Sequence, residues 1–213
     1  MASPLVSILL PHLRTPENNK ALAVALDCLA TNTGIDYELI IEGVEQRRDI
    51  YAVLNKMAAS ARCDWIIPFN SDVFVAPGWL EPIWANREPN TITSPVMVEC
   101  GAIGVNILNV HRNFGYTPET FRRVDFERWV SGGGEMPAGE RAWFFPSLLN
   151  RETFLRQGGF DTSQGEFPYH LDMIFWNKWE ADGLKFKRVR SFVYHLQQYS
   201  FEEEQQKPVR HGR

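Results

Sequence analysis

A small polar cluster at the end of an apolar run is the feature of the sequence best suited to chemistry. Asn70, Ser71 and Asp72 directly follow the apolar run 65–69. An open α/β sheet binds its ligands beyond the carboxyl ends of its strands, where a carboxylate placed like Asp72 would lie. A carboxylate beside an amide offers the oxygen ligands that Mg²⁺ or Mn²⁺ prefers. The plain alternative is that Asp72 only caps the following turn.

The elements that must position this cluster alternate between strands and helices. The apolar patterns predict strands at 5–10, 37–41 and 65–69, with one helix beginning at Pro16 and another at 50–61. This alternation is typical of an α/β fold with a mostly parallel central sheet flanked by helices. Right-handed crossovers then place the three carboxyl ends on one edge. We therefore expect residues 11–14, Glu42 and the cluster at 70–72 to meet there.

The rest of the chain is expected to complete the same single domain. Strands are predicted at 91–98, 143–149 and 186–195, and helices at 151–157 and 171–181. Residues 101–140 are expected to be irregular, with a helix start at Pro118. Their triple glycine at 132–134 lacks the lysine and spacing of a phosphate loop, and is interpreted as a hinge or a surface loop. We expect one domain at 1–200, with a nucleotide-binding half at about 1–98 and an acceptor half at about 99–200. A loose charged tail at 201–213 would follow.

Composition narrows the function classes. The chain has 213 residues, 44% of them hydrophobic, as in an ordinary globular domain. The net charge of −4 disfavours non-specific nucleic-acid binding but allows a local basic patch. Three cysteines without metal or disulfide spacing indicate a reducing compartment. With no predicted signal peptide or membrane span, we expect a cytoplasmic protein, or one in the host cytoplasm if the chain is viral.

In order and spacing, these segments resemble the GT-A glycosyltransferases, in particular the family-two type that uses nucleotide sugars. Residues 6–11 resemble the opening strand of that family, and 150–161 resemble the segment before its acceptor-side helix. The cluster at 70–72 stands where the family has an Asp-x-Asp metal motif, followed by Pro-Gly-Trp-Leu at 77–80. Asn55 matches an asparagine common on the helix before the third strand. His195 ends the last strand, where many GT-A enzymes place a third metal ligand.

The resemblance implies a Rossmann-like GT-A fold and an inverting hexosyl- or pentosyltransferase. The implied donor is a nucleoside-diphosphate sugar, with a UDP-sugar as the first expectation, and the acceptor is a glycan, a small molecule or a modified DNA base. Mn²⁺ or Mg²⁺ held by Asp72 and His195 would neutralise the leaving diphosphate. The alternative for His195 is an ordinary hydrogen-bonded histidine at a strand end.

Further residues are expected to hold the two substrates. Pro11, Leu13 and Arg14 would flank the base, Glu42 would contact the base or ribose as in the family, and Arg48 or its neighbour Arg47 would meet the phosphates. The expected nucleotide site is completed by Asn55, Asn70 and Ser71. The expected sugar or acceptor pocket consists of Trp79, Trp143 and Phe144, although core packing is the commoner use of such rings.

The acceptor hydroxyl must lose a proton as it attacks, so a base is required. Asp172 is the first candidate and His170 the second, although Asp172 could instead cap a helix. The sequence departs from the family at two points: Asn70 replaces the first aspartate of the metal motif, and Tyr169-His170 stands where a Glu-Asp pair is expected.

Three alternatives remain open. The same chemistry could act on a hydroxylated base in viral DNA, with His111, Arg112, Arg122, Arg123 and the arginine-containing tail forming a local groove. A nucleotidyltransferase is disfavoured because residues 11–16 contain no glycine. A sugar-nucleotide-binding module without activity is compatible with both departures from the family pattern.

Overall fold

The structure, a computed structural model, describes residues 3–100, 108–139, 145–163 and 171–196. Its strands are β1 Val6–Leu13, β2 Tyr37–Val44, β3 Trp65–Pro68, β4 Val73–Val75, β5 Thr91–Glu99, β6 Val110–His111, β7 Leu149–Asn150 and β8 Lys185–His195. Its α-helices are α1 Pro16–Asn32, α2 Ile50–Ser60, α3 Leu80–Ala85, α4 Arg123–Ser131, α5 Arg151–Arg156 and α6 Leu171–Ala181. Two 3₁₀ turns are η1 Arg47–Asp49 and η2 Pro118–Thr120.

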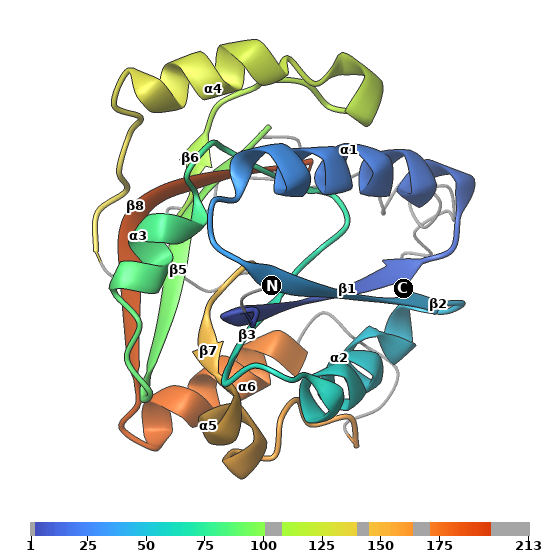
Figure 1. Cartoon of the computed structure of the whole chain (residues 1–213), viewed down its shortest axis with the longest axis vertical. Coiled ribbons are helices and arrows are strands. Elements are labelled where there is room, and N and C mark those ends of the chain that lie inside the picture. The colour runs from blue at the N-terminus through green and yellow to red at the C-terminus, as the bar shows by residue number, and fades with distance from the viewer. Residues whose placement is uncertain (1–2, 101–107, 140–144, 164–170, 197–213) are drawn as a thin grey trace, which may run out of the picture.

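The strands form two four-stranded sheets, ordered β2-β1-β3-β7 and β4-β8-β5-β6. In the first sheet β1 runs parallel to β2 and β3, and in the second β5 runs parallel to β8 and β6. Figure 1 shows α1 on one side of the first sheet and α2, α5 and α6 on the other. The predicted α/β class is confirmed, but the strands are divided between two sheets instead of forming one.

The faces of β1 explain how helices come to cover both sides of the first sheet. Successive side chains of a strand point to opposite faces. Val6, Ile8 and Leu10 join the core cluster that includes Leu29 of α1, whereas Leu9 joins the cluster that includes Leu54 of α2. The second cluster also holds rings from α5 and α6, namely Phe154, Phe175, Trp176 and Trp179. β1 is therefore buried on both faces, as a central parallel strand must be.

The first strand continues past the proline at which it was expected to stop. Leu9 accepts a hydrogen bond from Phe69 on the β3 side, and backbone groups of odd-numbered residues in β1 face that side. Pairing between β1 and β3 ends at Leu9, opposite Pro68. The nitrogen of Pro11 therefore faces a side on which no strand is paired with it. A strand tolerates proline at such a position because no backbone hydrogen bond is lost. On the other side, pairing with β2 continues to Leu13.

The two sheets are joined near the middle of the chain. Thr93 of β5 and Leu148 exchange two backbone hydrogen bonds, at 2.8 and 3.1 Å. Of the strand expected at 143–149, the described residues are in strand conformation only at Leu149–Asn150. Strands β7 and β8 from the expected acceptor half pair with β3 and β5 from the expected nucleotide half. Both sheets therefore contain strands from both expected halves of the domain.

The stretch expected to be irregular contains a regular helix, α4, which ends at the triple glycine. Gly133 and Gly134 both have positive φ angles, of 109° and 47°, that favour glycine. Arg190 donates to the carbonyl of Gly133, and a Cβ added to Gly134 would collide with the ring of Phe192. The triple glycine is thus a turn that Gly134 packs against β8, while Gly132 and Gly133 are exposed.

Two expected site residues have structural roles. The Asn55 amide donates to the carbonyl of Phe160 at 2.8 Å and accepts from its N–H at 2.9 Å, so both ends of the side chain hold the turn before residue 161. Trp79 is fully buried, and its indole N–H donates to Thr33 Oγ1 at 2.9 Å. Asn55 therefore supports this turn, and its contact with a nucleotide stays a prediction. Trp79 packs in the core, and contact of its ring with a sugar or acceptor stays a prediction.

The cysteines and the helices were each considered for what they indicate about the protein's compartment. Cys28, Cys63 and Cys100 are buried and free. No helix in the described part of the chain combines the length and apolar character needed to cross a membrane.

Replacing Asn55 by alanine is expected to destabilise the fold by about 2 kcal/mol. The change removes two hydrogen bonds and leaves the backbone groups of Phe160 without their partner. Chemical denaturation would measure the loss. Asn55→Asp keeps the acceptor but not the donor, so it should fall between wild type and alanine. An alanine variant as stable as wild type would contradict this structural role.

Candidate functional site

The carboxyl ends of β1, β2 and β3 meet at one edge of the first sheet, as expected from their parallel pairing. The chain leaves β3 at Pro68 and turns through Asn70 and Ser71, both half-buried, before β4 begins. Strand β4 then pairs antiparallel to β8, with Val73 opposite His195. This pairing places Asp72, the residue before β4, beside the end of β8.

A histidine between two carboxylates is the centre of the candidate site. His195 Nε2 lies 3.4 Å from Asp72 Oδ2, and His195 Nδ1 lies 3.5 Å from Glu99 Oε1. Glu99 ends β5 and is opposite His195 in the parallel pairing of β5 with β8. Both carboxylates are buried. Three strands, β4, β5 and β8, therefore bring these ionisable groups together.

The three side chains shift one another's ionisation. Burial by itself lowers the pKa of His195, but the two carboxylates outweigh it and raise that pKa to about 10. Burial by itself raises the pKa of Asp72 and of Glu99, but His195 lowers both below their ordinary values. With an imidazolium between two carboxylates, the cluster carries one net negative charge. A cation bound through His195 Nε2 would have to displace the proton from that nitrogen.

The arrangement fits a divalent cation held by two protein ligands. Ligands on one ion at about 2.1 Å each are separated by about 3 Å when they lie at right angles. The 3.4 Å between Asp72 Oδ2 and His195 Nε2 is close to that spacing. Within the described ranges no group of three or more His, Cys, Asp or Glu side chains is arranged to hold a metal. The imidazole ring separates Glu99 from Asp72, so the remaining ligands would have to come from groups other than these carboxylates.

Tyr51 interacts with Asp172 and with Arg47, and Arg47 also acts on Asp72 of the cluster. Arg47 lowers the pKa of both Asp72 and Tyr51, so its guanidinium acts on both groups. Burial, and after it the charge of Asp172, raises the pKa of Tyr51, which also interacts with the backbone of Asp172. Asp172 Oδ1 accepts from the N–H of Met173 at 2.7 Å, in the first turn of α6. Arg47 therefore interacts electrostatically with both Asp72 and Tyr51, and Tyr51 interacts with Asp172.

The expected base-binding residues line the ends of β1 and β2. Pro11 is buried and pairs with Glu42, while Leu13 pairs with Val44. Arg14 forms an exposed ion pair with Glu45 at 2.9 Å, and its guanidinium lies against Gly43, where a Cβ would collide with it. Glu42 pairs with Lys56 at 2.6 Å. These residues share one edge of the sheet with the cluster, and their contact with a nucleotide stays a prediction.

Sequence reasoning and the structure differ over two charged residues. Arg48 is exposed, whereas Arg47, the other arginine considered, is half-buried and acts on Asp72. Glu99 was missed because the strand 91–98 was expected to end one residue earlier. Glu99 lies beside His195 only because β5 and β8 end together in parallel register, which is tertiary information. His170, Trp143, Phe144 and the tail 201–213 lie outside the described residues.

Comparison with known proteins places the fold in a class. No known protein-family profile matches the sequence. No curated protein is significantly similar to it. Among solved structures, the crystal structure of GalNAc-T7 with UDP, GalNAc and Mn²⁺ is similar, with a TM-score of 0.56 and 12% sequence identity over 90% of this chain. The chain spans 43% of the length of that protein. The fold is therefore GT-A-like, as the sequence predicted.

The raised pKa of His195 predicts how stability depends on pH. Its folded pKa of about 10 lies above the ordinary value near 6.5, so its contribution is complete below about pH 6.5 and is lost as pH rises toward 10. Between pH 6.5 and 8.5 the wild type should lose about 2 kcal/mol that His195→Gln does not lose. Denaturation in metal-free buffer at several pH values measures this difference. Glu99→Gln should give an intermediate slope, and parallel curves for wild type and His195→Gln would contradict the assignment.

Proposed function

We propose that the chain is a glycosyltransferase that moves a sugar from a nucleoside-diphosphate sugar to an acceptor hydroxyl, with inversion at the anomeric carbon. A UDP-sugar is the first candidate donor, and the family-two type of GT-A enzyme is the proposed relationship. The observation that carries the proposal is the pair Asp72 and His195 at the carboxyl edge of a GT-A-like fold. That edge is where open α/β sheets bind ligands.

The charges around Asp72 suit a diphosphate. Asp72 and His195 would hold Mn²⁺ or Mg²⁺, which when bound neutralises the charge that builds up on the leaving diphosphate. Arg47 adds a second positive group on the same side, and guanidinium groups match phosphate oxygens well. Pro11, Leu13 and Glu42 are proposed to contact the base and ribose from the ends of β1 and β2. The buried Glu99 keeps His195 oriented with Nε2 toward Asp72.

Asp172 is the proposed base. As the acceptor oxygen forms its bond to the anomeric carbon, the bond from that carbon to the diphosphate oxygen breaks. The acceptor proton passes to the Asp172 carboxylate, and the nucleoside diphosphate leaves with the bonding electrons. A single in-line displacement of this kind inverts the anomeric centre and requires no nucleophile from the protein. Asp172 is half-buried at the start of α6, so a carboxylate oxygen can be reached from outside.

Donor binding can be tested without knowledge of the acceptor. UDP with Mn²⁺ should raise the melting temperature of the wild type, because a ligand at a hundred times its Kd stabilises by about 2.7 kcal/mol. Asp72→Asn should lose the part of the shift that depends on Mn²⁺. Asp182→Asn, which changes an exposed carboxylate beyond the other end of α6, is the matched control and should behave as wild type. If no nucleoside diphosphate or nucleotide sugar shifts the wild type, the donor site is contradicted.

The base assignment has its own test. Asp172→Asn should bind UDP and Mn²⁺ as the wild type does, yet lower kcat by a factor of about 100 to 10,000 in transfer or in slow donor hydrolysis. A variant with unchanged kcat would contradict Asp172 as the base. Pyrophosphate release from a nucleoside triphosphate would instead favour a nucleotidyltransferase. UDP binding without turnover in the wild type would favour a binding module.

A further inference from the structure

A pocket lined by arginines opens beside α4, apart from the candidate donor site. It has a volume of about 390 Å³. Its charged lining residues are Arg112, Arg122, Arg128 and Asp125, and its rings are Phe114 and Trp129. Three arginines against one aspartate leave the lining with two net positive charges, in a chain whose overall charge is −4. We refer to it as the arginine pocket.

Local contacts hold each arginine in place. Arg112 lies over the rings of Phe114 and Trp129, at 5.7 and 5.5 Å from their centroids, which leaves the edge of its guanidinium free to donate. Arg122 donates to the carbonyl of Asn113 at 2.6 Å. The Asp125 carboxylate lies 3.5 Å from both Arg122 and Arg128. Distances of this length between exposed groups give weak ion pairs, so the arginines keep most of their capacity to bind an anion.

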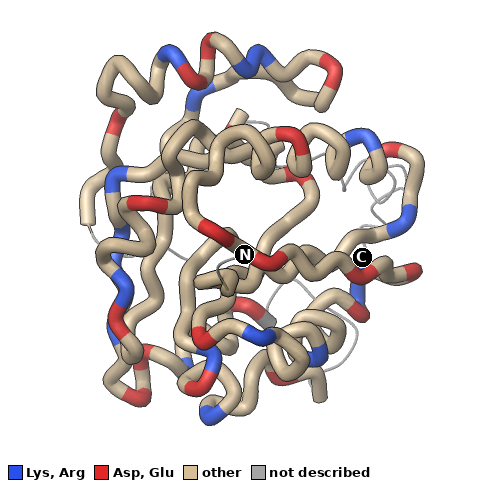
Figure 2. The backbone as a smooth tube through the Cα atoms, viewed as in Figure 1, with Lys and Arg blue, Asp and Glu red and all other residues tan. Residues whose placement is uncertain are grey.

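The neighbouring arginine serves as a contrast. Arg123 forms short ion pairs with Asp27 of α1 and Glu127, at 2.5 and 2.7 Å, and also bonds to Thr31. Its charge is used to attach α4 to α1, which lie next to each other in Figure 1. In Figure 2, α4 carries both blue and red segments, so the helix as a whole is not uniformly basic. Of the arginines expected to form a basic groove, Arg112 and Arg122 line the pocket and Arg123 does not.

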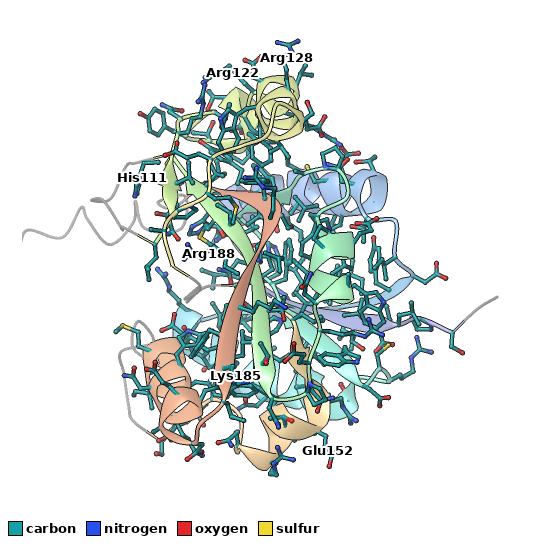
Figure 3. The ribbon with its side chains drawn as sticks, turned by 90° about the vertical axis from the view of Figure 1, so that its left-hand side faces the viewer. His111, Arg122, Arg128, Glu152, Lys185 and Arg188 are labelled. Carbon is teal, nitrogen blue, oxygen red and sulfur yellow. The ribbon has the colours of Figure 1, made fainter. Side chains whose placement is uncertain are left out.

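The arginine pocket adjoins the candidate donor site through β6. His111 of β6 pairs with Glu99, and the next residue, Arg112, donates its backbone N–H to the Glu99 carbonyl at 2.9 Å. Figure 3 shows Arg122 and Arg128 at the α4 end of the molecule, with His111 on the strand beside them. The backbone that carries Arg112 is therefore joined directly to the end of β5, next to the candidate donor site.

We propose that the arginine pocket binds a phosphate group of the acceptor substrate. Guanidinium groups bind phosphate in bidentate fashion, and the half-buried ring of Trp129 provides apolar surface on which a sugar or base attached to that phosphate can lie. The phosphate belongs either to a single-stranded nucleic acid or to a small phosphorylated molecule. That this ligand is the acceptor rests on the proposed function, whereas its binding does not.

Binding is tested on the full chain without donor or metal. A fluorescein-labelled oligothymidylate, followed by anisotropy, represents a nucleic acid, and glucose 6-phosphate, followed by calorimetry, represents a small phosphorylated molecule. The test variant is Arg112→Gln combined with Arg128→Gln, because these side chains are exposed. The matched control is Arg87→Gln, which removes an arginine that lies 4.0 Å from the ring centroid of Trp84 elsewhere on the molecule. Unchanged melting temperatures would verify that the variants are folded.

At least one probe should bind the wild type and the Arg87→Gln control equally. The double variant should bind that probe about tenfold more weakly, and for the oligonucleotide its salt dependence should fall by about one unit of slope or more. Oligothymidylate binding identifies a nucleic-acid ligand, and binding of glucose 6-phosphate alone identifies a small phosphorylated one. Equal binding by wild type and double variant, or no binding of either probe by the wild type, overturns the proposal. Because donor and metal are absent, a protein without transferase activity could still pass this test.

Discussion

The pairing of a three-residue strand with the last strand of the sheet is the constraint on which the site depends. Strand β4 is held against β8 in antiparallel register, and Leu196 donates to the Asp72 carbonyl at 3.2 Å. Without that pairing the Asp72 carboxylate would not be buried beside His195. An isolated buried carboxylate is costly, and the imidazolium offsets the cost. Local backbone pairing and the charge cluster therefore stabilise one another.

The scaffold behind this pairing is rigid because both faces of the first sheet are filled. Rings pack against rings below it: Phe160 lies 4.9 Å from Phe175 and 5.3 Å from Phe154, centroid to centroid. Above it, α1 buries its apolar face against β1 and β4. Interiors packed in this way keep side chains in fixed positions. The ends of β3, β5 and β8 can then hold ionisable groups at constant separations without help from a bound ligand.

The sequence predicts those elements whose signal lies within a short stretch of the chain, and it misses those that depend on distant partners. The alternation of strand and helix up to Pro68 is visible in short apolar runs, so the first three strands and two helices were found. Strand β4 was missed because it has three residues, Val73–Val75, and exists through pairing with a strand far along the chain. Arg47 and Arg48 are neighbours in a single 3₁₀ turn, and the turn's orientation decides which side chain points toward Asp72. The sequence does not reveal that orientation. The roles of Trp79 and Asn55 were likewise set by tertiary partners, Thr33 and Phe160.

The neutral Asn70 can be understood from the same charges. The sequence resemblance implies two aspartates in this segment, which would both supply negative charge to a cation. Here the second buried carboxylate comes from β5, as Glu99, behind the imidazole. A third carboxylate at position 70 would add repulsion to a cluster that has one histidine to offset two acids. A neutral amide at that position keeps an oxygen available to a cation or nucleotide at no such electrostatic cost. The neutral Asn70 and the buried Glu99 therefore together keep the number of acidic groups around His195 at two.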